Sequence, residues 1–160
     1  HPKFIGYFKK EKVKLKKILP EKFRIEHVGS TSVKNLGGKG IIDILIGVRN
    51  KKDLFKVKEL LENNKYKPSK VRGRRDKLSF EKDYGIFVKR KTHIHITPME
   101  SITWKEYLLT RDFLRKNPKI AREYEEIKKE GLKFAKGDGK KYQDYKRRFL
   151  NKIKREVLKN

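Results

Sequence analysis

The chain has 160 residues, of which 35% are hydrophobic and 41% charged, so we expect one domain with a single main core. With no cysteine, it can have neither a disulfide framework nor a thiolate metal site. Its 46 Lys and Arg against 20 Asp and Glu give a formal net charge of +26, which favours a polyanionic partner such as a nucleotide or RNA. Life at high temperature or a biased genome is the alternative explanation of such a surface.

The apolar residues fall in periodic runs, which is typical of a folded domain and not of a disordered chain. No apolar stretch approaches the ~20 residues that span a bilayer, and the first residues form no apolar signal segment. We therefore expect a cytoplasmic protein with no membrane partner.

The first half of the chain predicts a βαβα alternation that follows an initial helix. Helical spacing of apolar residues predicts that helix over about 7–19, ended by Pro20. A strand is predicted over 23–28, followed by a turn at 29–32 and a short helix. The apolar run 41–48 is typical of a central strand covered on both faces. A further helix over about 54–61 should stop near Asn63 and Asn64.

The second half changes from strands to helices. Strands are predicted at 78–82, 85–89 and 92–96, in antiparallel pairs. One helix is predicted around residues 104–108. A second helix should begin with Asn117 as its cap and Pro118 in its first turn, and Gly137 and Gly139 should end that helix. A basic amphipathic helix is predicted at the end of the chain. We expect one domain over 1–160 of the α/β (α+β) class, with a mixed sheet flanked by helices in about 1–100 and C-terminal helices packed on it in about 101–160.

The turn Gly29-Ser30-Thr31-Ser32 lies between a predicted strand and a helix start. Backbone N–H groups and hydroxyls there can converge on a phosphate, and a glycine allows the ligand to approach the backbone closely. The alternative interpretation is ordinary helix capping by Ser and Thr.

Asp43 is the one charged residue of the apolar run 41–48. A buried carboxylate needs a partner, so Asp43 is a candidate metal ligand or general base. In the alternative interpretation it accepts hydrogen bonds from the loop 37–39 or pairs with a buried base.

His93 and His95 stand two residues apart on a predicted strand, so both imidazoles should point to one face. They could bind a metal together with Asp43, position a substrate or exchange protons near neutral pH. A structural pair fits the same spacing.

Two further features are basic. Arg111 follows Trp104 and Leu108 at helical spacing, with Asp112 beside it, so its guanidinium is expected on or near the apolar face. The segment 65–77 carries seven basic residues and one acidic residue and is expected to be a loop that grips phosphates or is merely solvated.

Together these motifs resemble the GrpB family, in order and over nearly the whole chain. The segments that carry the resemblance are His27-Val28-Gly29-Ser30-Thr31-Ser32-Val33, Ile41-Ile42-Asp43-Ile44-Leu45, Thr92-His93-Ile94-His95-Ile96 and Arg111-Asp112-Phe113-Leu114-Arg115, with Pro118, Tyr124, Lys128, Tyr142, Lys146 and Phe149 after them.

The resemblance implies a nucleotidyltransferase-like, DNA polymerase beta-like fold, in which a Gly-Ser turn holds a triphosphate and paired carboxylates on the next strand bind magnesium. It implies a nucleotide or another phosphate-bearing ligand and a divalent metal, magnesium or manganese in preference to zinc, while the high positive charge makes RNA a further candidate partner. The residues so implied are Asp43 and His95 for catalysis, with Asp43, His93 and His95 for the metal, and His27, Gly29, Ser30, Thr31, Ser32, Lys39, Arg111 and Lys146 for the phosphates.

The sequence departs from that pattern at two places. The superfamily strand carries two acids separated by one residue, but Leu45 occupies the second position here, and histidines stand on the strand of the third acid. Gly38-Lys39-Gly40 stands where relatives usually have Lys-Pro. Nucleotidyl transfer is therefore one hypothesis, and a non-catalytic module that recognises a nucleotide, a coenzyme A precursor or RNA is the other.

Overall fold

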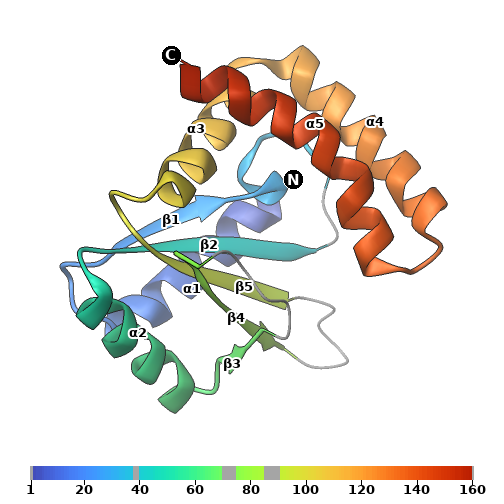
Figure 1. Cartoon of the computed structure of the whole chain (residues 1–160). Helices are drawn as coiled ribbons and strands as arrows, with labels where there is room; N and C mark the ends of the chain where they lie inside the picture. The colour runs from blue at the N-terminus through green and yellow to red at the C-terminus, as the bar shows by residue number, and fades with distance from the viewer. Residues whose placement is uncertain (1, 38–39, 70–74, 85–90, 160) are drawn as a thin grey trace.

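One mixed sheet forms the centre of the computed structural model, which describes residues 2–37, 40–69, 75–84 and 91–159 (Figure 1). Its strands lie side by side in the order β1-β2-β5-β4-β3. They are β1 (Arg24–Val28), β2 (Ile41–Val48), β3 (Lys67–Pro68), β4 (Leu78–Asp83) and β5 (Lys91–Pro98). β2 runs antiparallel to β1 and parallel to β5, and β4 runs antiparallel to both β5 and β3.

The register of the strands fixes which side chains share a face. Asp43 of β2 is paired with His93 of β5, and Ser79 of β4 is paired with His95. Because side chains alternate between faces along a strand, all four residues point to the same side of the sheet. The isoleucines that alternate with them point to the other side.

Two helices, α1 (Pro2–Ile18) and α2 (Lys51–Asn63), cover the isoleucine face. Leu15 of α1 and Leu61 of α2 are fully buried there against Ile44 and Ile94. Asn50 caps α2 through its side chain, which accepts a hydrogen bond of 2.9 Å from the N–H of Asp53. This face holds the largest core, whereas Asp43, His93 and His95 point to the opposite face.

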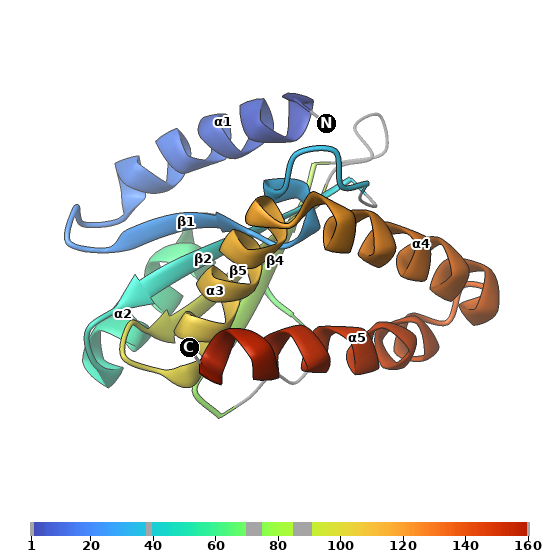
Figure 2. The same ribbon diagram turned by 90° about the horizontal axis from the view of Figure 1, so that it is seen from above.

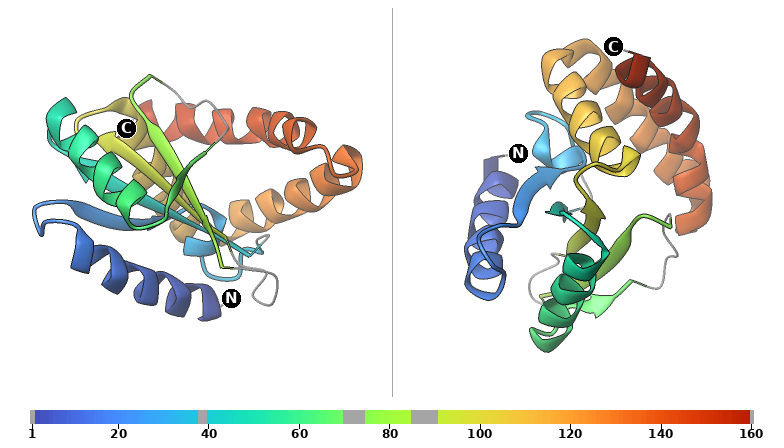
Figure 3. Two further views of the ribbon diagram at one scale, coloured as in Figure 1. Left: turned by 90° about the horizontal axis from the view of Figure 1, so that it is seen from below. Right: turned by 60° about the vertical axis from the view of Figure 1, so that its left-hand side comes forward.

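Three helices lie on the opposite side: α3 (Ile102–Lys116), α4 (Pro118–Ala135) and α5 (Gly139–Lys159). Figures 2 and 3 show α4 and α5 side by side, with the sheet between these C-terminal helices and α1. Trp104 of α3 packs on Val28 and Leu45, which anchors α3 to the sheet. A separate core lies between α3, α4, α5 and the segment that follows the 29–32 turn, with Leu36, Leu114 and Ile153 buried in it.

The α/β class, the mixed sheet and the helical last third confirm the predictions from sequence. The first helix begins five residues earlier than predicted, and the 92–96 strand pairs in parallel with β2 as well as antiparallel with β4. The expected strand at 85–89 lies outside the described residues. No helix in the described parts of the chain is long and apolar enough to cross a membrane.

The predicted break after the fourth helix is confirmed, because α4 ends at Ala135 and α5 begins at Gly139. Asn117 and Pro118 occupy the N-cap position and the first turn of α4, as predicted, but one detail of the cap differs. The side chain of Asn117 does not cap α4, because its amide donates a hydrogen bond of 2.8 Å back to the carbonyl oxygen of Phe113. In addition, β3 lies inside the segment 65–77, for which the sequence predicts a loop.

Candidate functional site

The 29–32 turn starts with a glycine that the geometry requires. Gly29 has φ 71° and ψ −175°, a conformation open essentially to glycine alone. A Cβ at this position would lie 2.9 Å from Cγ of Asp43 and closer still to its Oδ2. The turn and the Asp43 carboxylate are therefore in direct contact, as the sequence hypothesis of one common site requires.

The three hydroxyls of the turn have different surroundings. The hydroxyl of Ser32 donates a hydrogen bond of 2.6 Å to the carbonyl oxygen of Gly29 and so closes the turn on itself. Oγ1 of the buried Thr31 lies 3.2 Å from Nε2 of His27. Ser30 is the hydroxyl residue of the turn that lines the two cavities described below.

His27 lies on the isoleucine face of the sheet, away from Asp43. Its ring stacks on that of Phe8 from α1, with centroids 4.6 Å apart. Burial lowers its pKa to about 4, with Arg115 and Arg111 acting in the same direction and Asp43 against them. His27 is neutral at physiological pH and lines neither of the two cavities described below. Its described contacts are therefore structural.

Asp43 lies between the two predicted histidines. Its Oδ1 is 3.6 Å from Nδ1 of His93 and 3.9 Å from Nε2 of His95, and a quarter of its side chain is exposed. Burial alone would raise the pKa of Asp43, but its interactions with His93 and His95 prevail and hold it well below the ordinary value. Asp43 is therefore a carboxylate at physiological pH, and its partner is a pair of imidazoles.

His95 is the more buried of the two histidines, with 13% of its side chain exposed against 33% for His93. Its Nδ1 lies 3.1 Å from the hydroxyl of Ser79, and its ring stacks on Tyr107 of α3 at 5.2 Å. Burial lowers its pKa, against the opposing effect of Asp43. A neutral imidazole held on three sides can accept a proton from a ligand in the cavity.

The prediction that Asp43, His93 and His95 form a metal site has less support. Within the described ranges, no three His, Cys, Asp or Glu side chains are grouped so that they could hold a metal ion. Leu45, in the place of a second acid, is fully buried against Val28 and Trp104. These residues do not fit the paired-carboxylate magnesium site that the resemblance implies.

A cavity of about 400 Å³, here called the histidine cavity, brings most of the predicted residues together. Lys146 of α5 also lines it, with Nζ 4.3 Å above the ring of Tyr142. Lys77, the last residue of the basic segment 65–77, also lines it and donates a hydrogen bond of 3.2 Å to the Tyr107 hydroxyl. The lining residues are Gly29, Ser30, Asp43, Ser69, Lys77, Ser79, Phe80, His93, His95, Tyr107, Tyr124, Gln143, Lys146 and Leu150.

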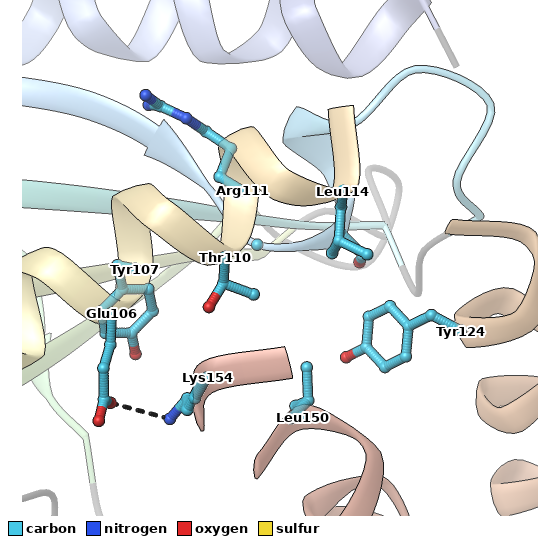
Figure 4. A pocket seen from close by; sticks show the side chains of 10 residues that line it. Glu106, Tyr107, Thr110, Arg111, Leu114, Tyr124, Leu150 and Lys154 are labelled. Atoms are coloured by element: carbon cyan, nitrogen blue, oxygen red, sulfur yellow. Dashed lines mark ion pairs between the residues drawn. The ribbon is translucent and has the colours of Figure 1, made fainter. Parts of the chain in front are cut away.

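A second cavity of about 190 Å³, here called the threonine cavity, lies between α3 and α5 (Figure 4). It shares Gly29, Ser30, Tyr107, Tyr124 and Leu150 with the histidine cavity. Glu106 and Lys154 form an ion pair of 3.0 Å in its wall. The hydroxyl of Thr110 is buried without a hydrogen-bond partner in the described structure. No sequence pattern indicated this cavity, because it depends on how two distant helices pack.

Arg111, which the resemblance implies for the phosphates, is one of the residues that line the threonine cavity. Its guanidinium points away from the threonine cavity (Figure 4) and donates to Glu26 and Asp112 at 2.9 and 2.8 Å, and to the carbonyl oxygen of His27 at 3.2 Å. Arg111 therefore fastens α3 to β1. The basic residue that contacts the turn is Arg115, whose Nε and Nη2 donate to the carbonyl oxygen of Ser32 at 3.1 and 2.9 Å.

A buried lysine supports the end of the segment after the turn. Nζ of Lys128 on α4 donates to the carbonyl oxygen of Gly37 and lies 5.5 Å from the ring centroid of Tyr124. Burial lowers the pKa of Lys128 to about 8, with Glu125 opposing the shift. Lys39, expected to bind phosphate, is two residues further along and lies outside the described residues.

The sheet, the helices and the placement of the turn beside Asp43 define a nucleotidyltransferase-like fold. The structure of the Cid1 poly(U) polymerase, determined with MgGTP bound, has the same fold over 80% of this chain and 41% of its own, with a TM-score of 0.51 and 14% sequence identity. At that identity the likeness concerns the fold alone.

The chain belongs to the GrpB family. The model of the family described as GrpB protein matches residues 1–156. The glutamate-rich protein GrpB of Alkalihalophilus pseudofirmus is 35% identical over 154 residues, 94% of this chain and 88% of its own. The crystal structure of the conserved protein GrpB from Enterococcus faecalis superposes with a TM-score of 0.84 and 32% identity, covering 99% of this chain and 94% of that one. The UPF0157 protein YqkA of Bacillus subtilis is 36% identical over 129 residues, which span 80% of this chain but 37% of YqkA.

Proposed function

We propose that the protein binds the phosphates of a nucleotide in the histidine cavity. The observation that carries the proposal is that the Gly29-Ser30 turn, the Asp43-histidine cluster and two lysines all line one cavity of about 400 Å³. Cavities of this size are typical of small-molecule sites. The ligand would lie between the sheet and α5, with its phosphates at Ser30 and Lys146.

Charges in the cavity favour an anion despite the carboxylate. Asp43 is tucked against Gly29, and both of its imidazole partners lie on the sheet. Lys77, just before β4, and Lys146 of α5 come from the other walls of the cavity. A phosphate chain can therefore contact these two ammonium groups and the Ser30 hydroxyl, while the imidazoles of His93 and His95 lie against Asp43.

Isothermal titration calorimetry at physiological salt tests this proposal, with the four common nucleoside triphosphates and inorganic tripolyphosphate as probes. Lys146→Met should weaken binding about tenfold or more, because a charge-assisted hydrogen bond is lost, and Ser30→Ala about three- to tenfold. Lys141→Met is the matched control: it removes one charge from an exposed position of the same helix that lines neither cavity.

Equal losses in Lys146→Met and Lys141→Met would contradict the proposal, because they would mean that net charge alone attracts the probes. Binding of short RNA with an affinity that collapses as salt is added would favour the general nucleic-acid binder. If coenzyme A precursors bind tightly and the triphosphates do not bind, the cavity would remain the proposed binding site, but its ligand would be a coenzyme A precursor.

Nucleotidyl transfer is the second candidate, and the neutral His95 imidazole beside Asp43 favours it. In such a step His95 would take the proton of an acceptor hydroxyl, the new bond would form to the α-phosphorus, and pyrophosphate would leave. We derive no step through a metal ion, because the described residues do not supply the second carboxylate. Release of pyrophosphate from a nucleoside triphosphate, lost in His95→Gln and Asp43→Asn, is the expected result for a transferase. Activity that both variants retain would exclude this mechanism.

A further inference from the structure

Phosphate binding leaves the threonine cavity unused. Gly29 and Ser30 line both this cavity and the histidine cavity, so a ligand whose phosphates lie at the turn has the threonine cavity directly beside it. Figure 4 shows Leu114 of α3, Leu150 of α5 and Tyr124 of α4 around its interior. These walls are apolar and suit a flat ring more than a sugar or a second phosphate.

A few polar groups point into this apolar space. The Thr110 hydroxyl is directed into the cavity, as is the hydroxyl of Tyr124 (Figure 4). Oγ1 of Thr110 is buried and has no hydrogen-bond partner among the described residues. An unsatisfied buried hydroxyl destabilises a protein, and a ligand that hydrogen-bonds to it removes that cost. Glu106 and Lys154, 3.0 Å apart, present an acceptor and a donor side by side in the same wall.

We propose that the threonine cavity holds the base of a pyrimidine nucleotide, an inference that rests on the phosphate site proposed above. A cavity of about 150 Å³ accepts one benzene ring, so the 190 Å³ of this cavity suits one six-membered ring with its carbonyl or amino groups. A two-ring purine needs more space. Uracil and cytosine each have a donor and an acceptor next to each other on one edge, which complements the Glu106–Lys154 pair.

Calorimetry with UTP, CTP, ATP, GTP and inorganic tripolyphosphate tests the assignment on the full chain. UTP and CTP should bind at least tenfold more tightly than the other three probes. Thr110→Leu fills the cavity and should lower the affinity for UTP and CTP to that for tripolyphosphate, which should itself stay unchanged. Thr110→Val keeps the shape and loses the hydroxyl, so it should weaken pyrimidine binding about three- to tenfold.

The matched control is Thr103→Val, which removes another buried hydroxyl without a partner in the described structure, at a position of α3 that lines neither cavity. It should leave all five affinities unchanged. Equal affinity for all five probes, or tighter binding of ATP and GTP, would overturn the pyrimidine assignment and leave the phosphate site intact. Binding of no probe by a folded protein, as judged by circular dichroism, would overturn both.

Discussion

Replacing Gly29 with alanine should destabilise the protein through two separate effects. An L-residue at φ 71° and ψ −175° costs on the order of 1–3 kcal/mol of backbone strain. The new Cβ would also displace the Asp43 carboxylate, because it would lie 2.9 Å from Cγ of that residue. Loss of the interactions between Asp43 and its histidines adds about 1 kcal/mol, discounted for the exposed quarter of the side chain. Gly29→Ala should therefore lower the free energy of unfolding by about 3 kcal/mol and Tm by about 6–12 °C.

Chemical denaturation of four variants separates these effects. Gly137 also has a positive φ, of 93°, but a Cβ added there would have nothing within 4 Å, so Gly137→Ala measures backbone strain alone. In an Asp43→Ala background the Gly29→Ala penalty should fall by about 1 kcal/mol, because the carboxylate is no longer there to be displaced. A penalty that is the same in both backgrounds and equal to that of Gly137→Ala would refute the contact between the turn and Asp43.

Two further predictions concern buried polar groups. Thr110→Val and Thr103→Val should each raise the free energy of unfolding by about 1 kcal/mol, because each removes a buried hydroxyl without a partner in the described structure; thermal melts in which both variants are less stable would contradict this. His27 has a pKa of about 4 in the folded state against an ordinary 6.5, so the unfolded state takes up a proton first and stability falls as pH drops from about 6.5 to 4, by about 3 kcal/mol in all. His27→Gln should remove that part of the pH dependence, and parallel stability curves for the two proteins would contradict the assignment.

Local sequence patterns predict those parts of the site whose residues are close in sequence or paired in neighbouring strands. The two-residue spacing of His93 and His95 places both imidazoles on one face, and the charge of Asp43 in an apolar strand indicates a partner. Both features follow from the period of a strand and the cost of burying a charge. The pairing of β2 with β5 brings Asp43 to the histidines, as the sequence hypothesis assumes.

The features that the sequence does not determine depend on side-chain direction and on helix packing. Arg111 donates to Asp112, as the sequence indicates, but its guanidinium also turns to Glu26, a choice that helical spacing does not determine. His27 lies one residue from Val28 on β1, and that single step puts its ring on the other face of the sheet. Thr110 reaches a cavity only because α3, α4 and α5 pack around it, which no local pattern encodes.

The packing of α3 on the sheet accounts for a leucine at position 45 and not a second acid. A carboxylate at position 45 would replace a fully buried leucine that contacts Val28 and Trp104, and it would be left without a partner beneath the helix. Gly47, the next residue on this face, lies under the same tryptophan: a Cβ there would meet the Trp104 ring at 2.8 Å. Leu45 and Gly47, which follow Asp43 on this face of β2, thus pack against α3. α3 in turn contributes Thr110 to the threonine cavity and Tyr107 to both cavities. Because Leu45 stands where a second carboxylate would be needed, we propose ligand binding ahead of nucleotidyl transfer.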